Sequence, residues 1–453
     1  MKYRTEKDAL GPVKVPVDAL YGAQTQRASE NFRISGLRLQ DHFIKALAII
    51  KKYAAVVNAD LGLIDKEVSE LIIAATDELI EGKYYDQFIV DVFQTGSGTS
   101  TNMNINEVVA GRANEIHTGS RGSKQPVHPN DHVNLCQSSN DVIPTAINIS
   151  ALLLVENSLE PALMKLYKSL SSKAEEFASI KKLGRTHLQD AVVMTLGQEF
   201  SGYAAQIAKN IERLSEVKKE LLELSLGGTA VGTGINAHPE FAAKVIVMIA
   251  DQTGLAFREA GNHFASQASQ DSQVALSGVL KTTGVSLSKI ANDIRWLSSG
   301  PRAGLGEINL PALQPGSSIM PGKVNPVIPE AVLQVAAQLT GNDATITAAA
   351  KGGNFELNTM LPLIAYNLIQ SVEILASASF VFAEKCIDGI TANEEKCKSN
   401  VENSLDVAVK LIPYIGYDRA SEIARQAYEQ GKTVKQVIEQ EKVLTGEQMR
   451  EVF

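Results

Sequence analysis

Apolar residues recur at steps of three and four along three stretches of the chain. They are Ile207, Ile211, Leu214, Val217, Leu221 and Leu224 in the first stretch, and Leu276, Leu280, Leu287, Ile290, Ile294 and Leu297 in the second. A third series follows Pro362 as Ile364, Leu368, Val372 and Leu375. This spacing puts the side chains on one face of a helix. No segment of useful length alternates apolar and polar residues, so we predict a mainly α fold.

The positions of the prolines support long helices. The 15 prolines leave long gaps, among them Val17–Gln125 and Ala162–His238. Long helices of this kind usually form elongated bundles. Stretches of small residues, such as Ala344–Ala350, indicate burial of helices against other subunits. Around Pro413–Gly416 the pattern changes to short, charged helical segments, which predicts a small C-terminal domain.

Charge and composition exclude several classes of protein. Lys and Arg number 43 against 51 Asp and Glu, and no basic tail is present, which disfavours a nucleic-acid partner. No run reaches the roughly 18 uncharged apolar residues of a membrane helix. The start, Met1–Asp8, has no apolar region, so we expect a cytoplasmic protein. Cys136, Cys386 and Cys397 lie too far apart for a disulfide framework or a local zinc motif.

Glycine-rich, polar turns interrupt the helical pattern at Gln94–Asn106, Val127–Asp141, Leu183–Asp190 and Leu313–Glu330. The last of these contains the sequence GSSIMPGKVNP, which is not a phosphate-binding Walker A loop. Five residues separate its glycines, and Val324 follows Lys323 where a hydroxyl would be needed for Mg²⁺. Two hydroxyls, a lysine and an amide on a loop that leads into a helix, starting at Pro326 or Pro329, indicate an anion site.

GSSIMPGKVNP resembles the signature of the fumarase/aspartase superfamily, homotetrameric lyases of which most release fumarate from a substituted succinate. The likeness extends through TGSGT (95–99), VHPND (127–131), QSSND (137–141), GRTHLQD (184–190) and GGTAVGTG (227–234). The resemblance implies a three-domain fold whose central bundle of long helices joins a core of about twenty helices in the homotetramer. It divides the chain into an N-terminal domain (1–137), a central helical domain (138–395) and a C-terminal domain (396–453).

Two branches of the superfamily compete, class II fumarase and aspartase. Aspartases tend to read GGAGTS, QSTND, GATA and GQFELN where this chain reads TGSGTS, QSSND, GGTA and GNFELN. All four segments resemble fumarase, whereas His187 and Val327–Glu330 occur in both branches. The resemblance implies a fumarate hydratase of the tricarboxylic acid cycle that adds water reversibly and anti to fumarate, giving (S)-malate, without metal or cofactor. The alternative is an aspartate ammonia-lyase.

The resemblance also implies the site residues. Those that bind the substrate are Ser97, Gly98, Thr99, Ser138, Ser139, Asn140, Thr186, Ser318, Val324 and Asn325. The catalytic residues are Ser317, His187, Glu330 and Lys323. The loops that carry them are spread from Ser97 to Glu330, and in the superfamily each active site is shared among three subunits.

The chemistry explains why such groups are needed. Removal of the C3 proton of malate creates an aci-carboxylate with two full negative charges, which Lys323 and Asn325 would stabilise. Ser317 is the base of the family, and because serine is a weak base the loop must stabilise its alkoxide. His187, oriented by Glu330, would protonate the departing hydroxyl on the opposite face through a bound water.

Each residue also has a structural alternative. Ser317 alone would be a turn or helix-cap serine, and Glu330 a first-turn acid at a helix N-terminus. His187 and Lys323 alone would be a structural histidine and a solvated lysine. Ser97 and Thr99 could cap a helix that begins near Asn104. Only the combination favours an active site, and it disfavours a purely structural protein such as the lens members of the superfamily.

His128, Pro129, Asn130 and Asp131 resemble a second dicarboxylate-binding place outside the active site of fumarases. Gln125 and Pro126 stand where basic residues are expected, and the nearest upstream positive charge is Lys124. The alternative is that His128 and Pro129 form a rigid turn leading into the loop at Ser138.

Overall fold

The computed structural model describes residues 2–453, which are mainly helical. The chain divides into two compact units, each built from three stretches. We call Met1–Pro161, Asn210–Gly284 and Val335–Ser377 the first unit, and Ala162–Lys209, Val285–Gln334 and Ala378–Phe453 the second unit. The domain borders expected after residues 137 and 395 stay predictions.

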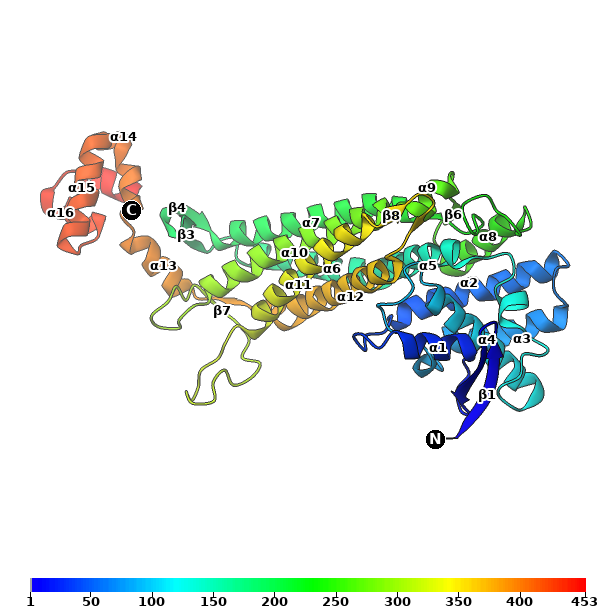
Figure 1. Cartoon of the computed structure of the whole chain (residues 1–453). Helices are drawn as coiled ribbons and strands as arrows, with labels where there is room; N and C mark the ends of the chain where they lie inside the picture. Colours follow the sequence, from blue (N-terminus) through cyan, green and yellow to red (C-terminus); the bar gives the residue numbers. More distant parts are fainter. Residues whose placement is uncertain (1) are drawn as a thin grey trace. The chain divides into compact units, whose positions relative to one another are not determined.

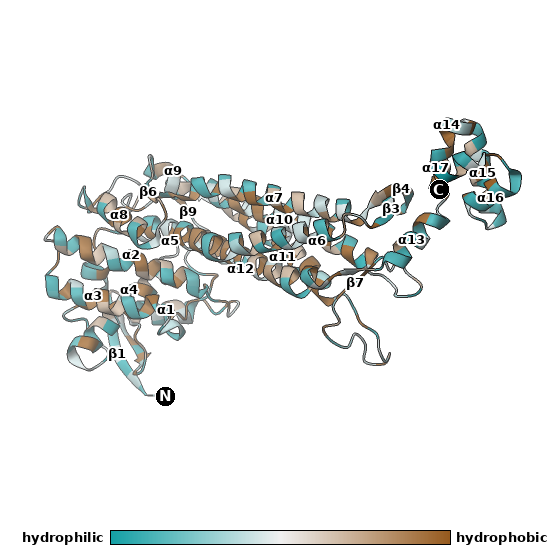
Figure 2. Ribbon diagram, turned by 180° about the vertical axis from the view of Figure 1, so that it is seen from behind, coloured by the Kyte–Doolittle hydropathy of each residue, from teal (hydrophilic) through white to brown (hydrophobic). Residues whose placement is uncertain are grey.

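The three predicted helical stripes lie in long helices (Figure 1). These are α7 (Leu196–Leu221), α10 (Asp271–Leu297) and α12 (Leu361–Lys385), which confirms the prediction. Leu224 is the exception, because α7 ends at Leu221 and Leu224 belongs to β5 (Glu223–Leu224), which pairs with β6 (Arg258–Glu259). In Figure 2 polar and apolar residues mix along these helices, as expected where one stripe is buried and the rest is solvated.

Helices of the first unit pack around α2 (Asp41–Asp60). Its neighbours are α3 (Lys66–Ile80), α4 (Thr99–Thr118), α5 (Ser139–Leu154) and α8 (Phe241–Thr253). Twelve residues of α2 are buried, Phe43, Leu47 and Ile50 completely. This core supports the N-termini of α4 and α5, where two of the predicted site loops end.

Two β-hairpins depart from the predicted all-helical pattern. One pairs β1 (Tyr3–Asp8) with β2 (Gly11–Pro16), and the other pairs β3 (Lys181–Thr186) with β4 (Gln189–Thr195). The hydrophobic pattern did not predict them because β1 exposes mostly polar residues and a register shift interrupts the alternation in β3. The second hairpin carries the predicted site residues Thr186 and His187.

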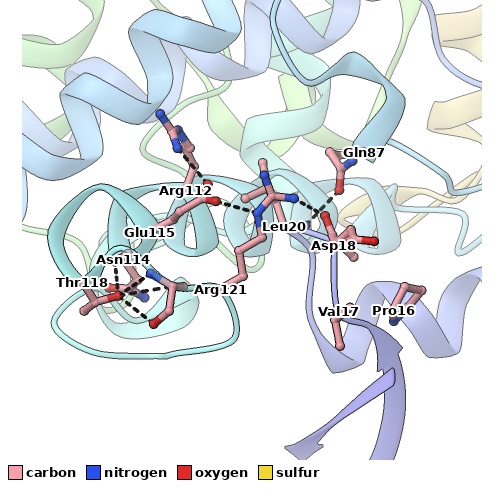
Figure 3. A network of polar contacts seen from close by, with 12 residues as sticks. Pro16, Val17, Asp18, Leu20, Gln87, Arg112, Asn114, Glu115, Thr118 and Arg121 are labelled. Atoms are coloured by element: carbon pink, nitrogen blue, oxygen red, sulfur yellow. Dashed lines mark hydrogen bonds and ion pairs between the residues drawn. The ribbon is translucent and has the colours of Figure 1, made fainter. Parts of the chain in front are cut away.

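A polar network ties α4 to the N-terminal segment (Figure 3). Glu115 accepts hydrogen bonds from Arg112 (2.8 Å) and from Arg121 (2.7 Å), and Arg121 also donates to the carbonyl oxygen of Asp18. Nearby, Leu20 donates its amide to the side chain of Gln87 (2.9 Å). The contacts of Glu115 and Arg121 thus tie the C-terminal half of α4 to the segment around Asp18.

The C-terminal part of the second unit consists of short helices, as predicted. They are α13 (Glu394–Asn403), η5 (Leu405–Leu411), α14 (Ile412–Ile415), α15 (Tyr417–Gln430), α16 (Val434–Glu441) and α17 (Gly446–Val452). Apolar side chains such as Leu411, Ile423 and Val437 form a small core between them.

The remaining elements are α1 (Ala23–Asn31), η1 (Tyr85–Gln87), η2 (Pro129–Val133), η3 (Val155–Leu159), α6 (Glu160–Glu176), α9 (His263–Ala268), β7 (Ile308–Asn309), α11 (Val327–Ala350), β8 (Gly353–Asn354), β9 (Leu357–Asn358), η4 (Ile387–Gly389) and β10 (Thr391–Ala392). Two helical stretches, Ser139–Glu176 and Leu361–Gly389, are long and apolar enough for a membrane span by length and composition alone. Within the protein, 78% and 56% of their most apolar windows are buried, and core helices pass the same test.

Candidate active site

Two helix N-termini meet in the first unit and bring together site residues from two loops. The helix α4 begins at Thr99 and α5 begins at Ser139. The hydroxyl oxygens of these two residues lie 2.7 Å apart. Both helices direct the positive end of their dipoles toward this point, which favours an anion.

The hydroxyls of this cluster hydrogen bond to one another rather than cap a helix. Ser97 Oγ lies 2.8 Å from Thr99 Oγ1. The expected alternative, capping of a helix near Asn104, is wrong, because α4 begins five residues earlier and its N-cap is Gly98, which has no side chain. Gly98 has φ of 74°, and a Cβ there would lie 2.9 Å from Ile143, so glycine is required.

The loop before α5 is held by its own capping box. Ser138 Oγ accepts a hydrogen bond from the amide of Asn140 (3.2 Å), and Asp141 accepts one from the amide of Ser138 (2.9 Å). The buried Asp141 also accepts from the amides of Gly227 (3.1 Å) and Thr229 (3.0 Å). Burial raises the pKa of Asp141, although these backbone hydrogen bonds oppose the shift. One carboxyl group thus connects two of the predicted motifs.

A cavity of about 530 Å³ lies beside this cluster in the first unit. Its lining includes Thr99, Asn102, Asn130, Asn134, Gln137, Ser138 and Ser139. The volume lies within the range of small-molecule sites, and the lining offers neutral hydroxyl and amide groups. The cavity therefore suits a small polar ligand with several hydrogen-bond acceptors.

In the second unit, Thr186 and His187 lie at the tip of the hairpin β3–β4. His187 and Leu188 are the two turn residues, with φ of 56° and 60°. A two-residue hairpin turn with both φ values positive usually contains Asn or Gly, so side chains here carry a backbone cost. Thr186 and His187 are exposed. The turn therefore holds the imidazole in an exposed position with a strained backbone.

An internal ion pair anchors the strand that ends at this tip. Arg185 donates two hydrogen bonds to Glu307, of 3.0 and 2.7 Å, and Glu307 is completely buried. Lys182 and Asn400 also contact this carboxylate. Burial raises the pKa of Glu307, but Arg185, Lys182 and Asn400 together lower it below its usual value. No sequence motif pointed to Glu307, because its partners are distant along the chain.

We expect Glu307→Gln to destabilise the second unit by about 3 to 5 kcal/mol, because it removes the carboxylate that binds the guanidinium group of Arg185, whereas Lys182 keeps its ion pair with Glu199. Since the folded-state pKa of Glu307 is lowered, its contribution is present above the unfolded-state pKa and is lost as pH falls through the folded-state value. Denaturant titrations at pH 7 and in acid measure both effects. Glu395→Gln, at an exposed position of α13, is the control, and it should change neither the free energy of unfolding nor its dependence on pH.

The loop Gly316–Pro326 is closed by two hydrogen bonds. The amide of Gly316 donates to the carbonyl oxygen of Lys323 (2.7 Å), and the side chain of Asn325 donates to the carbonyl oxygen of Gly316 (2.6 Å). Ser317 Oγ accepts from the amides of Ile319 (3.2 Å) and Met320 (3.0 Å). Two N–H donors aimed at one hydroxyl oxygen favour its ionised form.

This loop leads into α11, which begins at Val327, between the two predicted starts. Lys323, Val324, Asn325 and Glu330 line a cavity of about 630 Å³ in the second unit, together with Arg295 and Trp296. The side chain of Ser318 is exposed. Positive charge and a helix N-terminus make this cavity a second place suited to an anion.

The hairpin tip lines a different cavity of the second unit. Leu188, Gln189 and Asp190 border a space of about 1070 Å³ against the C-terminal helices. Within residues 2–453, no ion pair joins His187 to Glu330, and these residues contain no group of three or more His, Cys, Asp or Glu side chains placed to hold a metal. The pairing of imidazole and carboxylate that the resemblance implies stays a prediction.

The segment His128–Asp131, which resembles a second dicarboxylate-binding site, forms a turn. His128 caps η2, and its Nδ1 accepts from the amides of Asn130 (3.3 Å) and Asp131 (3.2 Å). Pro129 is the first residue of η2, and the ammonium group of Lys124 donates to the carbonyl oxygen of Lys7. These contacts support the turn interpretation, and dicarboxylate binding here stays a prediction.

Known proteins are similar to this chain along its whole length. The family described as Lyase matches residues 11–341, and the one described as Fumarase C C-terminus matches residues 409–453. A Fumarate hydratase class II from Nitrosomonas europaea is 52% identical, covering 99% of this chain and 97% of the relative. An Aspartate ammonia-lyase from a Bacillus species is 49% identical, covering 99% and 96%. The crystal structure of a class II fumarase from Schistosoma mansoni superposes with a TM-score of 0.95 at 40% identity, covering 100% of this chain and 98% of the other.

Proposed function

The chain belongs to the lyase family and, within it, to the class II fumarate hydratases, and we propose that its active site is assembled from three groups of residues contributed by three subunits of a homotetramer. The resemblance of its loops to this superfamily and the predicted mainly α fold are confirmed. The enzyme interconverts fumarate and (S)-malate. The assignment of residues to roles, the tetramer and the sharing of sites are the parts that we propose.

The observation that carries the proposal is that one chain carries its site residues in three groups on different loops, and that His187, Ser318 and Lys323 are exposed. The first group is the hydroxyl cluster of Ser97, Thr99 and Ser139 in the first unit. The second is the exposed tip with His187, and the third is the loop from Ser317 to Asn325. A dianion that reacts in a site closed to bulk solvent must be surrounded by protein on several sides. Neighbouring subunits would supply those sides.

Binding of the substrate divides between two of the groups. We assign one carboxylate to the hydroxyl cluster, where the N-termini of α4 and α5 converge and Asn140 follows Ser139 in the first turn of α5. Lys323 and Asn325 bind the other carboxylate, next to C3. Hydroxyl and amide donors fix the orientation of the substrate, while Lys323 places a positive charge at the carboxylate next to C3. Gly98, Ser138, Thr186, Ser318 and Val324 complete the proposed binding set.

Two proton transfers follow from this placement. The Ser317 alkoxide takes the C3 proton, and the electron pair moves into the adjacent carboxylate, which becomes an aci-carboxylate held by Lys323. The pair then returns to form the C2–C3 double bond as the C2–oxygen bond breaks. On the opposite face His187, oriented by Glu330 of a different subunit, delivers a proton through water to the departing hydroxide. Fumarate and water are the products.

A subunit-complementation experiment tests the shared site. Chains carrying His187→Asn and Ser317→Ala are each expected to form nearly inactive homotetramers. Co-expression should restore activity, because about one site in four receives both intact residues if they come from different chains. The control is co-expression of Ser317→Ala with Lys323→Met, which lie on one loop and leave every site with a defect. Inactivity of both mixtures would show that one chain supplies His187 and Ser317 to the same site.

A further inference from the structure

Lys51 is a completely buried lysine in α2 that the proposed mechanism does not use. Its ammonium group donates to three side-chain amide oxygens, those of Asn102 (2.9 Å), Asn134 (3.1 Å) and Gln137 (2.9 Å). An ammonium group has three hydrogens, so each finds an acceptor. None of the three acceptors carries a charge, which is unusual because a buried charge normally pairs with an opposite one.

The three acceptors belong to the two segments that form the hydroxyl cluster. Asn102 lies in the first turn of α4, three residues after Thr99. Asn134 and Gln137 lie in the turn that leads into Ser138. All three amides line the 530 Å³ cavity together with Thr99, Ser138 and Ser139. Lys51 therefore joins the two segments from behind the cavity wall.

The ammonium group also sets the direction of these amides. Because their oxygens face Lys51, their nitrogens point into the turn and donate there. Asn134 Nδ2 donates to the carbonyl oxygen of Gln137 (3.2 Å), and Gln137 Nε2 donates to those of Val133 (3.1 Å) and Leu135 (3.0 Å). The conformation of the turn before Ser138 thus depends on the ammonium group of Lys51.

The charge of Lys51 is only partly balanced in the described chain. Burial lowers the pKa of Lys51 to about 7, and the field of Asp141 opposes the shift. The carboxylate of Asp141 is itself occupied by three backbone amides. Around the ammonium group, α4 and the turn before α5 present neutral amides, and α5 presents Asp141. A dicarboxylate in the adjacent cavity would supply further negative charge.

We infer that Lys51 is a positioning residue for the substrate, which holds the two carboxylate-binding segments together and attracts the dianion from behind the cavity wall. The inference rests on the proposed function, since it takes the hydroxyl cluster to be a carboxylate site. Lys51 does not touch the reacting atoms. Loss of Lys51 should weaken binding of the substrate and of the transition state by the same amount. This raises KM and leaves kcat nearly unchanged.

The first test is Lys51→Met, which keeps an unbranched side chain one atom shorter than lysine and removes its charge. We expect KM for malate and fumarate to rise about 10- to 100-fold, as for one unit charge a few ångströms from a dianion at intermediate dielectric. kcat should change less than about threefold. Lys52→Met is the matched control one position along, where the ammonium group pairs with Asp77 (2.7 Å) at the helix surface, and it should keep the wild-type KM. An unchanged KM in a folded Lys51→Met enzyme would overturn the inference.

A second test measures proton uptake when a dicarboxylate binds. Succinate, an unreactive dicarboxylate, is titrated into the wild-type enzyme at pH 7.5 by calorimetry in two buffers of different ionisation heat. Because a bound dianion raises the pKa of Lys51 from about 7, the enzyme should take up part of a proton, and succinate affinity should fall as pH rises above 7. Uptake should persist in His187→Asn, which excludes the imidazole as its source.

The outcomes separate the two proposals. No proton uptake by a wild-type enzyme that binds succinate, or equal uptake in Lys51→Met, overturns the role of Lys51 and leaves the proposed function standing. A wild-type chain that neither binds succinate nor converts malate overturns the proposed function, and the inference about Lys51 falls with it. Uptake in the wild type that is lost in Lys51→Met supports the inference.

Discussion

Ser317→Ala is expected to lower kcat about a thousandfold in both directions, with KM changed less than about threefold. Alanine cannot accept the C3 proton, and it leaves the amides of Ile319 and Met320, which donate to Ser317 Oγ, without a partner. The substrate-binding groups stay intact, so the loss falls on the chemical step. Initial rates from the absorbance of fumarate measure both constants.

Ser318→Ala is the matched control for this prediction. Ser318 is the neighbouring residue, exposed on the same loop, and we assign it to substrate binding. Its replacement should raise KM more than it lowers kcat. If Ser317→Ala retains a tenth or more of the wild-type kcat, Ser317 is not the base, and another group must remove the proton.

Lys323→Met is expected to lower kcat about 100- to 1000-fold, in the range found when one donor to a developing anion is removed. The aci-carboxylate carries one more negative charge than the carboxylate of malate, so the ammonium group is needed most at the transition state. Lys323 also binds the substrate in the ground state, and a smaller rise in KM should accompany the loss. Steady-state rates over a range of malate concentrations separate the two effects.

Lys351→Met makes the same change of charge at an exposed position after the end of α11. It should leave kcat and KM at wild-type values, which shows that net charge alone does not explain the loss. Equal losses in the two variants would mean that Lys323 acts through the overall field of the protein rather than at the intermediate.

The helical part of the fold could be predicted because it follows from local spacing. The stripes that contain Ile207, Leu280 and Leu368 mark α7, α10 and α12 with their buried faces. The hairpin β3–β4 could not be predicted in the same way, because a register shift after Leu183 breaks the alternation. Leu224 shows a further limit, since its pairing with a strand far along the chain is invisible to periodicity.

The site was predictable as a set of loops but not as an arrangement. Motifs identify which loops carry Ser97, His187 and Ser317, whereas the contact between Thr99 and Ser139 depends on the packing of α4 with α5. Lys51 gave no signal because Lys51-Lys52 in a helix looks like a solvated face.

The reaction that the assembled site performs can be measured directly. The purified protein, with a chelator present, is mixed separately with (S)-malate and with L-aspartate, and the absorbance band of fumarate is followed. We expect fumarate from malate alone. Fumarate from aspartate alone would contradict the proposed function, because the same fold and the same anion stabilisation would then serve the removal of ammonia rather than water.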